Sequence, residues 1–112
     1  MLSQDSQGGS VYGEMIPTEG GDNIPLRKQT LIVGRRANCD IVLRFADVST
    51  IHCLLTLGGG YWFVKDLHSR SGTAVNGVPI QEERLEPGDI LGVGKRSYRV
   101  DYSPTDNLAM GR

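Results

Sequence analysis

The sequence RRANCDIVLRFADVSTIHCLLTLGGGYWFVKDLHSRSGTAVN, residues 35–76, decides the fold and carries the candidate site of this chain. Apolar and β-branched runs alternate in it with polar breaks at 34–36, 48–52 and 66–73. The runs are typical of β-strands, because branched side chains pack well on a pleated, half-buried surface. Arginines and small hydroxyl residues gather in the breaks. If the breaks meet at one end of a sheet scaffold, they form a pocket for a doubly charged anion.

The runs themselves predict an all-β protein. The apolar run Thr30–Gly34 predicts a strand that is buried on both faces, and 51–57 alternates so that Ile51, Cys53, Leu55 and Leu57 share one face. Gly58-Gly59-Gly60 predicts a hairpin turn into a partner strand at 61–67. Further strands are expected over residues 12–18, 24–26, 41–43, 73–75, 78–80, 89–93 and 97–102. No window keeps a helical period, so the many short strands separated by glycine turns predict a sandwich or a barrel.

At 112 residues the chain is expected to form one domain. Residues 1–11 are rich in Ser, Gln and Gly and are predicted to be a flexible N-terminal segment. Residues 12–102 are predicted to be the domain. The polar residues 103–112 are expected to be a flexible, frayed C-terminal tail.

Charge and composition exclude several classes of function. The net charge is −1, divided into +3 over residues 27–102 and −4 over the remainder. Non-specific nucleic-acid binding needs a denser basic face, whereas this distribution fits one local anionic ligand. No apolar run approaches the roughly 18 residues of a membrane span, and no secretion signal is seen, so we expect a cytoplasmic protein that contacts neither nucleic acid nor membrane.

The two cysteines, Cys39 and Cys53, are expected to be small buried hydrophobic residues in a reducing compartment. A disulfide would require close Cα atoms, which the sequence alone does not show. Metal binding would require more ligands at better spacing, so no metal is expected.

The first polar break offers an arginine for phosphate binding. Arg35 follows Gly34 at the end of a predicted buried strand, and a glycine permits close backbone approach there. An arginine held at a rigid strand end can present its planar fork to a phosphate group. An equally weighted alternative is a structural salt bridge to a loop carboxylate, either Asp40 or Asp66.

The second break places Ser49 three residues before His52. The serine hydroxyl and its backbone N–H can both donate to an anion, and the histidine can hold that loop by a side-chain hydrogen bond. A Ser-His hydrolase is the rival interpretation. It is disfavoured because there is no nucleophile elbow and because three residues along an extended strand is too far for easy proton transfer.

The third break, Ser69-Arg70-Ser71-Gly72-Thr73, is by itself a polar loop whose hydroxyls typically cap turns. Its value lies in combination with Arg35 and Ser49. The Asn76-Gly77 pair that follows is the strongest hairpin signal in the chain and predicts a type I′ turn.

In order and spacing, these pieces resemble the forkhead-associated (FHA) domain family over roughly residues 30–102. The family pattern is a G-R at a strand end, an S-x-x-H, a W-x-V-x-D-L-x-S-x-N-G-T-x-V-N-G, and a late G-D. The corresponding pieces of this chain are Gly34-Arg35, Ser49-Thr50-Ile51-His52, Trp62-Phe63-Val64-Lys65-Asp66-Leu67, Gly72-Thr73-Ala74-Val75-Asn76-Gly77 and Gly88-Asp89.

The resemblance implies a two-sheet β-sandwich of about eleven strands with ligand loops at one end. It implies a signalling module that binds phosphothreonine in a partner protein, such as a Ser/Thr kinase or its substrate, with no catalytic activity and no cofactor. The resemblance assigns phosphate binding to Arg35, Ser49 and Thr50. It assigns peptide binding to Arg70, Ser71 and Asn76, and structural support of the site to Gly34, His52 and Gly72.

Two positions depart from the family pattern. Thr50 stands where a basic residue or Asn often helps to hold the phosphate, and Ser71 stands where an Asn grips the peptide backbone. A serine hydroxyl is shorter and lacks the donor and acceptor fork of an amide. The alternative function is therefore a phospho-independent protein interaction domain on the same scaffold. Extra charge from Arg36, Arg44 and Arg70 would compensate for the loss of the amide.

Overall fold

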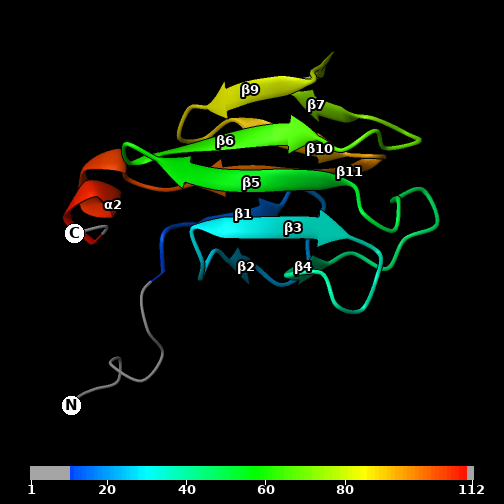
Figure 1. The fold of residues 1–112 in the computed structure, drawn as a ribbon, viewed down its shortest axis with the longest axis horizontal. Helices are drawn as coiled ribbons and strands as arrows, with labels where there is room; N and C mark the ends of the chain where they lie inside the picture. The colour runs from blue at the N-terminus through cyan, green and yellow to red at the C-terminus, as the bar shows by residue number, and fades with distance from the viewer. Residues whose placement is uncertain (1–10, 111–112) are drawn as a thin grey trace.

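The computed structural model describes residues 11–110, which fold into two β-sheets packed face to face (Figure 1). The six-stranded sheet has the order β2 (Ile24–Pro25), β1 (Glu14–Pro17), β11 (Arg96–Asp101), β10 (Ile90–Val93), β7 (Thr73–Val75) and β8 (Val78–Pro79). The five-stranded sheet has the order β4 (Ile41–Val42), β3 (Thr30–Gly34), β5 (Cys53–Gly58), β6 (Tyr61–Asp66) and β9 (Glu82–Leu85). The predicted all-β sandwich of about eleven strands is confirmed.

The core lies between the two sheets and is built by alternation along the strands. It contains Leu31, Val33, Leu55, Val64 and Trp62 from one sheet, and Met15, Leu91, Val93, Tyr98 and Val100 from the other. The fully buried Trp62 also donates its indole N–H to the carbonyl oxygen of Tyr12 at 3.1 Å, so its one polar atom is satisfied.

The prediction that β3 is buried on both faces is wrong. Leu31 and Val33 are buried, but Ile32 between them is 36% exposed. Each sheet of a sandwich has only one face against the core, so an apolar residue at the middle position of this strand faces outward.

The loops that follow β3, β4, β6 and β10 all lie at one end of the sandwich, at the right of Figure 1. The cause is the chain direction, because these four strands run toward that end. We call the four connections the site loops: residues 35–40, 43–52, 67–72 and 94–95. At the opposite end lie the β5–β6 hairpin and the helix α2 (Pro104–Met110).

Two turns behave as the sequence predicts. Gly59 and Gly60 close the β5–β6 hairpin with φ of 59° and 87°, and Asn76 and Gly77 have φ of 52° and 83°. Positive φ at both central residues defines the type I′ turn, which matches the twist of the strands it joins.

Two elements were not predicted. The polar segment 81–86 contains β9, which pairs with β6 although only Leu85 is buried. The expected frayed tail after residue 102 is instead the helix α2, whose Asn107 is 3% exposed and donates its side-chain N–H to the Gly60 carbonyl at 3.2 Å. The predicted flexible segment 1–11 falls almost wholly outside the described residues. Over residues 11–110, no helix has the length and apolar character needed to cross a bilayer.

We expect Asn107→Ala to lower the free energy of unfolding by about 1–2 kcal/mol, because it leaves the Gly60 carbonyl without its partner. Urea denaturation followed by Trp62 fluorescence measures this loss. The exposed Thr105→Ala in the same helix is the matched control and is expected to stay near wild type. Equal stability of the two variants would show that α2 does not anchor the hairpin.

Candidate functional site

The site begins at the end of β3, where a glycine lets two segments of the chain pack closely. A Cβ atom at Gly34 would lie 2.3 Å from the carbonyl oxygen of Thr50, so only glycine lets the two segments pack this closely. The Arg35 N–H then donates to the Ser49 carbonyl at 2.9 Å, and the Arg36 N–H donates to the Thr50 carbonyl at 3.2 Å. The structure therefore brings together two polar breaks that are separated by more than a dozen residues.

Arg35 is half-buried and held in place by its own side chain. Its Nε donates to the Val48 carbonyl at 2.9 Å, which leaves the two terminal Nη groups available. The alternative salt bridges are not formed: Asp40 pairs with Lys28 at 2.6 Å, and Asp66 accepts from hydroxyl groups of its own loop. Within the described residues, Arg35 is thus an oriented guanidinium without a carboxylate partner.

Ser49 lies beside Arg35 and is also half-buried. Its Oγ accepts a hydrogen bond from the Arg70 backbone N–H at 2.9 Å. An accepting hydroxyl keeps its own hydrogen free to donate. Thr50 follows as an exposed residue, and the backbone of Arg70 links the loop 67–72 directly to this serine.

His52 is fully buried and joins three segments of the chain. Its Nδ1 accepts the Ser49 backbone N–H at 3.1 Å, so the hydrogen resides on Nε2, which donates to the Gly72 carbonyl at 2.8 Å. Its backbone pairs with Val33 and Leu67. Because both ring nitrogens are occupied by backbone groups, this imidazole is not positioned to take a proton from the Ser49 hydroxyl.

Asp66 organises the loop that follows β6. It accepts hydrogen bonds from the Ser69 N–H at 3.2 Å, the Ser69 hydroxyl at 2.5 Å and the Thr73 hydroxyl at 2.6 Å. Burial by itself raises the pKa of this carboxyl, but the hydrogen bonds from Ser69 and Thr73 outweigh it, and the net pKa is lowered. Ser69 also accepts from the Gly72 N–H at 3.0 Å, so the loop is shaped by its own polar groups.

Asp47 is a residue of the site that the sequence did not reveal. Its carboxylate accepts the Lys95 backbone N–H at 2.6 Å, and its carbonyl oxygen accepts the Ser71 hydroxyl. The hydrogen bond from Lys95 lowers the pKa of this carboxyl. A Cβ atom at Gly94 would lie 2.9 Å from the Asp47 carbonyl oxygen, and Gly94 has a positive φ of 61°, so this approach also requires glycine. One aspartate thus joins three of the site loops, and nothing in the sequence around it marks that role.

The structure does not bring Asn76 into this cluster. Its amide donates to Asp89 at 3.0 Å and accepts from the Ile90 N–H at 2.9 Å, at the start of β10. The cluster lies beside Gly94, past the other end of the same strand, where the Gly94 N–H donates to the Gly72 carbonyl at 3.1 Å. Asn76 therefore serves the turn and the β7–β10 pairing.

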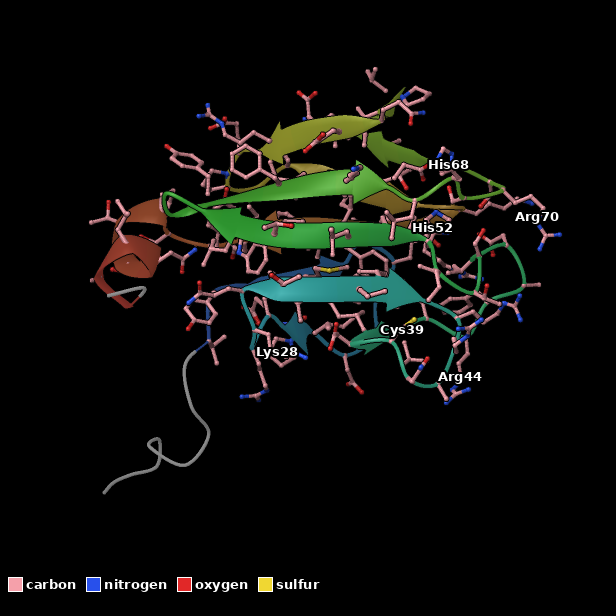
Figure 2. The ribbon with its side chains drawn as sticks, in the orientation of Figure 1. Lys28, Cys39, Arg44, His52, His68 and Arg70 are labelled. Atoms are coloured by element: carbon pink, nitrogen blue, oxygen red, sulfur yellow. The ribbon has the colours of Figure 1, made fainter. Side chains whose placement is uncertain are left out.

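The end of the sandwich that carries the cluster is rich in arginine. Arg36, Arg44 and Arg70 are exposed on the site loops, and Figure 2 shows Arg44, Arg70 and the buried His52 toward that same end. The remaining peptide-binding candidate, Ser71, is exposed there too, with its hydroxyl directed to Asp47. Over residues 11–110 no group of three His, Cys, Asp or Glu side chains is arranged to hold a metal ion. The cluster suits an anion with several acceptor oxygens.

Comparison with known proteins gives consistent results. A family model described as the FHA domain matches residues 31–94. Human proliferation marker protein Ki-67 is 32% identical over 88 residues, which cover 78% of this chain and 3% of Ki-67. FHA domain-containing protein FhaB of Mycobacterium tuberculosis (strain ATCC 25618 / H37Rv) is 32% identical over 90 residues, covering 77% of this chain and 58% of FhaB. The chain spans less than two thirds of the length of both curated relatives.

The fold comparison agrees with the family match. A solved structure from an analysis of phosphothreonine-dependent FHA domain interactions aligns with a TM-score of 0.76 and 30% identity. The alignment covers 82% of this chain and 97% of that chain.

We expect His52→Ala to lower the free energy of unfolding by about 2–4 kcal/mol, because it empties a buried volume, leaves the Ser49 N–H unpaired and leaves the Gly72 carbonyl with only its hydrogen bond from the Gly94 N–H. The exposed His68→Asn, at a positive φ that Asn tolerates, is the control. Urea denaturation measures the stability of both variants. A wild-type midpoint for His52→Ala would contradict the view that His52 holds the loops together.

The lowered pKa of Asp66 predicts a pH dependence of stability. A carboxyl whose pKa is lower in the folded state stabilises the fold above its ordinary pKa of 3.8, and this contribution disappears as pH falls through the folded value. The difference in unfolding free energy between wild type and Asp66→Asn is therefore expected to shrink between pH 7 and about pH 2.5. Asp106→Asn, at an exposed position of α2, is the matched control. A wild-type minus Asp66→Asn difference that stays constant over this range would contradict the assignment.

Proposed function

Because this chain belongs to the FHA domain family, we propose that it is a phosphothreonine-peptide-binding signalling module that recruits Ser/Thr-phosphorylated proteins. The single observation that carries the proposal is the meeting of Arg35 and Ser49. Both side chains are fixed by hydrogen bonds to loop backbone, and both keep donors free for a ligand. The solved structure described as phosphothreonine-dependent supports the same ligand.

The chemistry of the ligand matches the donors. Phosphothreonine carries a charge of about −1.5 to −2 and three acceptor oxygens. The free Nη groups of Arg35 supply charge-assisted hydrogen bonds, and the Ser49 hydroxyl supplies one more. Thr50 is exposed beside them and completes the proposed phosphate site. Gly34, His52 and Gly72 hold the loops without touching the ligand.

Peptide binding is proposed for the loop 67–72. The Arg70 side chain is exposed, while its backbone is fixed to Ser49. Ser71 donates its hydroxyl hydrogen to Asp47, so toward a peptide it offers only acceptor capacity. The peptide grip of this chain is therefore proposed to rest more on Arg70 than on the residue in the family's Asn position.

The proposed partner is a phosphothreonine-bearing protein, either a Ser/Thr kinase or its substrate, met in the cytoplasm. We propose no catalytic activity, since the engagement of both nitrogens of His52 leaves no base for Ser49. No cofactor is needed for recognition by charge and hydrogen bonding alone.

The engagement of Ser71 with Asp47 favours one second candidate, a phospho-independent interaction domain on the same scaffold. The two candidates differ in a simple test. Phosphatase treatment of the partner abolishes capture in the first case and leaves it unchanged in the second.

We expect Arg35→Ala to weaken phosphopeptide binding at least about a hundredfold, because charge-assisted hydrogen bonds contribute about 1.5–3 kcal/mol each. Titration calorimetry with a degenerate phosphothreonine peptide pool measures the loss, with the unphosphorylated pool as blank. The exposed Arg99→Ala on β11 is the matched control and is expected to bind like wild type. Circular dichroism checks that both variants fold. Wild-type affinity in folded Arg35→Ala would overturn the proposed site.

A further inference from the structure

Asp47 takes part in a closed set of hydrogen bonds among three of the site loops. Its carboxylate accepts the Lys95 N–H at 2.6 Å, and its backbone carbonyl accepts the Ser71 hydroxyl. The loops that carry these two partners are also joined to each other, because the Gly94 N–H donates to the Gly72 carbonyl at 3.1 Å. Each of the three loops is thus fixed to the other two. We call these three contacts the Asp47 latch.

The Asp47 latch adjoins both proposed phosphate donors along the chain. Asp47 directly precedes Val48, whose carbonyl accepts the Arg35 Nε–H at 2.9 Å and so orients the guanidinium. Asp47 also lies two residues before Ser49. The residue before Ser71 donates its backbone N–H to the Ser49 hydroxyl at 2.9 Å. A movement of Asp47 would therefore displace the acceptor that orients the arginine, together with the serine itself.

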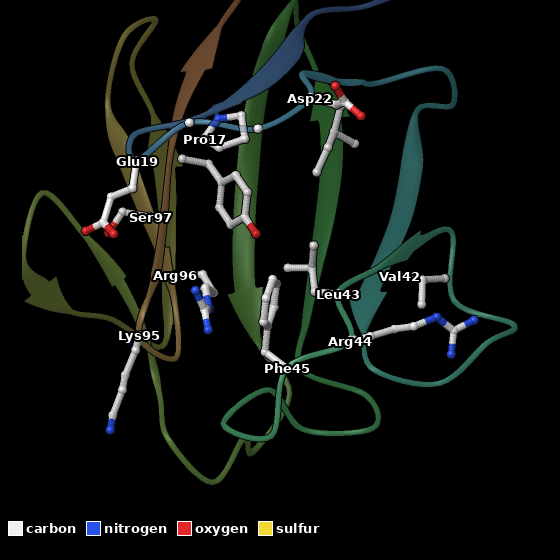
Figure 3. A pocket seen from close by; sticks show the side chains of 14 residues that line it. Pro17, Glu19, Asp22, Val42, Leu43, Arg44, Phe45, Lys95, Arg96 and Ser97 are labelled. Carbon is white, nitrogen blue, oxygen red and sulfur yellow. The ribbon is translucent and has the colours of Figure 1, made fainter.

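A second contact holds the loop 43–52 against the β10–β11 turn. The Arg96 guanidinium lies over the Phe45 ring, 3.7 Å from its centre, and Figure 3 shows the two side chains next to each other. The Phe45 carbonyl accepts the Val48 N–H at 3.0 Å, and the Val48 side chain is fully buried. The loop is thus anchored on both sides of Asp47, and the Asp47 latch fixes the short stretch between the two anchors.

Ser71 has a different task from the Asn that the family pattern places at this position. Its hydroxyl hydrogen is donated to Asp47, and a Cβ atom at Gly94 would lie 2.9 Å from its oxygen. The hydroxyl therefore lies against both Asp47 and Gly94, where the longer amide of an Asn would have to turn away. The short side chain at position 71 suits the contact between the loops.

We propose that Asp47 is a positioning residue for phosphate recognition, which acts by holding the Arg35 guanidinium and the Ser49 hydroxyl in place for the ligand. Donors that are already fixed lose less conformational entropy when a ligand binds, so the Asp47 latch raises affinity without contacting the phosphate. The Ser71 hydroxyl serves the same latch. This inference rests on the proposed phosphothreonine function and adds to it the residues that set its affinity.

The test measures the affinity for the degenerate phosphothreonine peptide pool by titration calorimetry. Asp47→Ala removes the acceptor of the Lys95 N–H and is expected to weaken binding about tenfold. Asp47→Asn keeps a side-chain oxygen as acceptor and is expected to stay within about twofold of wild type. Ser71→Ala is expected to weaken binding about fivefold, whereas Ser71→Thr keeps the hydroxyl and is expected to bind like wild type.

Asn107→Ala is the control that separates affinity from stability. It removes a hydrogen bond at the opposite end of the sandwich, so it is expected to be less stable than wild type and to bind equally well. A second readout follows the arginine itself. In ¹⁵N-labelled protein the Nε–H signal of Arg35, identified by its loss in Arg35→Ala, is expected to move in Asp47→Ala and to keep its position in Asp47→Asn and Asn107→Ala. Circular dichroism checks that each variant folds.

The outcomes separate this proposal from the proposed function. Failure of wild type to bind any phosphorylated pool would overturn the function itself. Wild-type affinity in folded Asp47→Ala, or weakened binding with an unmoved Arg35 signal, would overturn the positioning role and leave the function standing. An equal loss of affinity in Asp47→Ala and Asn107→Ala, or in Asp47→Ala and Asp47→Asn, would do the same. Tighter binding by Ser71→Asn than by wild type would show that position 71 grips the peptide, and would remove Ser71 from the Asp47 latch.

Discussion

The close approach of the chain at Gly34 to the segment 49–50 is the constraint on which the site depends. A side chain at position 34 would collide with the Thr50 carbonyl, and the backbone pairing of Arg35 with Ser49 would be lost. That pairing holds the backbones of Arg35 and Ser49 together, and the hydrogen bond from Arg35 Nε to the Val48 carbonyl holds the guanidinium against the same loop. His52 then fixes the spacing between the loops 43–52 and 67–72, because its ring is hydrogen-bonded to Ser49 through one nitrogen and to Gly72 through the other. The β scaffold thereby holds the arginine and serine side chains in one arrangement. Less side-chain conformational entropy is then lost when a ligand binds.

Much of the fold follows from the sequence because turns and alternation are local signals. Gly58-Gly59-Gly60 and Asn76-Gly77 fix two hairpins, and the alternation 53–57 fixes a buried face. The strand β9 was not predicted, because a Glu-Glu-Arg-Leu segment has no strand pattern of its own. It forms a strand only through its pairing with β6. The helix α2 was not predicted for the same reason. Its seven residues are too few to show a helical pattern, and the helix is stabilised by its contact with Gly60.

The site, too, was predicted from the sequence only in part. The meeting of Arg35 and Ser49 was expected from the order of the polar breaks, and the hydrogen bond by which His52 holds the Ser49 loop was expected from its place three residues on. The full burial of His52 was not expected. Asp47 was not expected, because its partners at 71 and 95 lie far along the chain and only the folded loops bring them together. Its hydrogen bonds with Ser71 and Lys95 also tie the loop 43–52, which carries Ser49, to the two neighbouring site loops.

The most direct test of the central claim is a titration of ¹⁵N-labelled protein with a phosphothreonine peptide and with its unphosphorylated counterpart. The account predicts that the phosphorylated peptide shifts the backbone amide signals of the segments 35–36, 49–50 and 70–71, and that the unphosphorylated peptide leaves them in place. Shifts confined to the outer face of the five-stranded sheet, around Ile32, Leu54 and Phe63, or identical responses to both peptides, would contradict it.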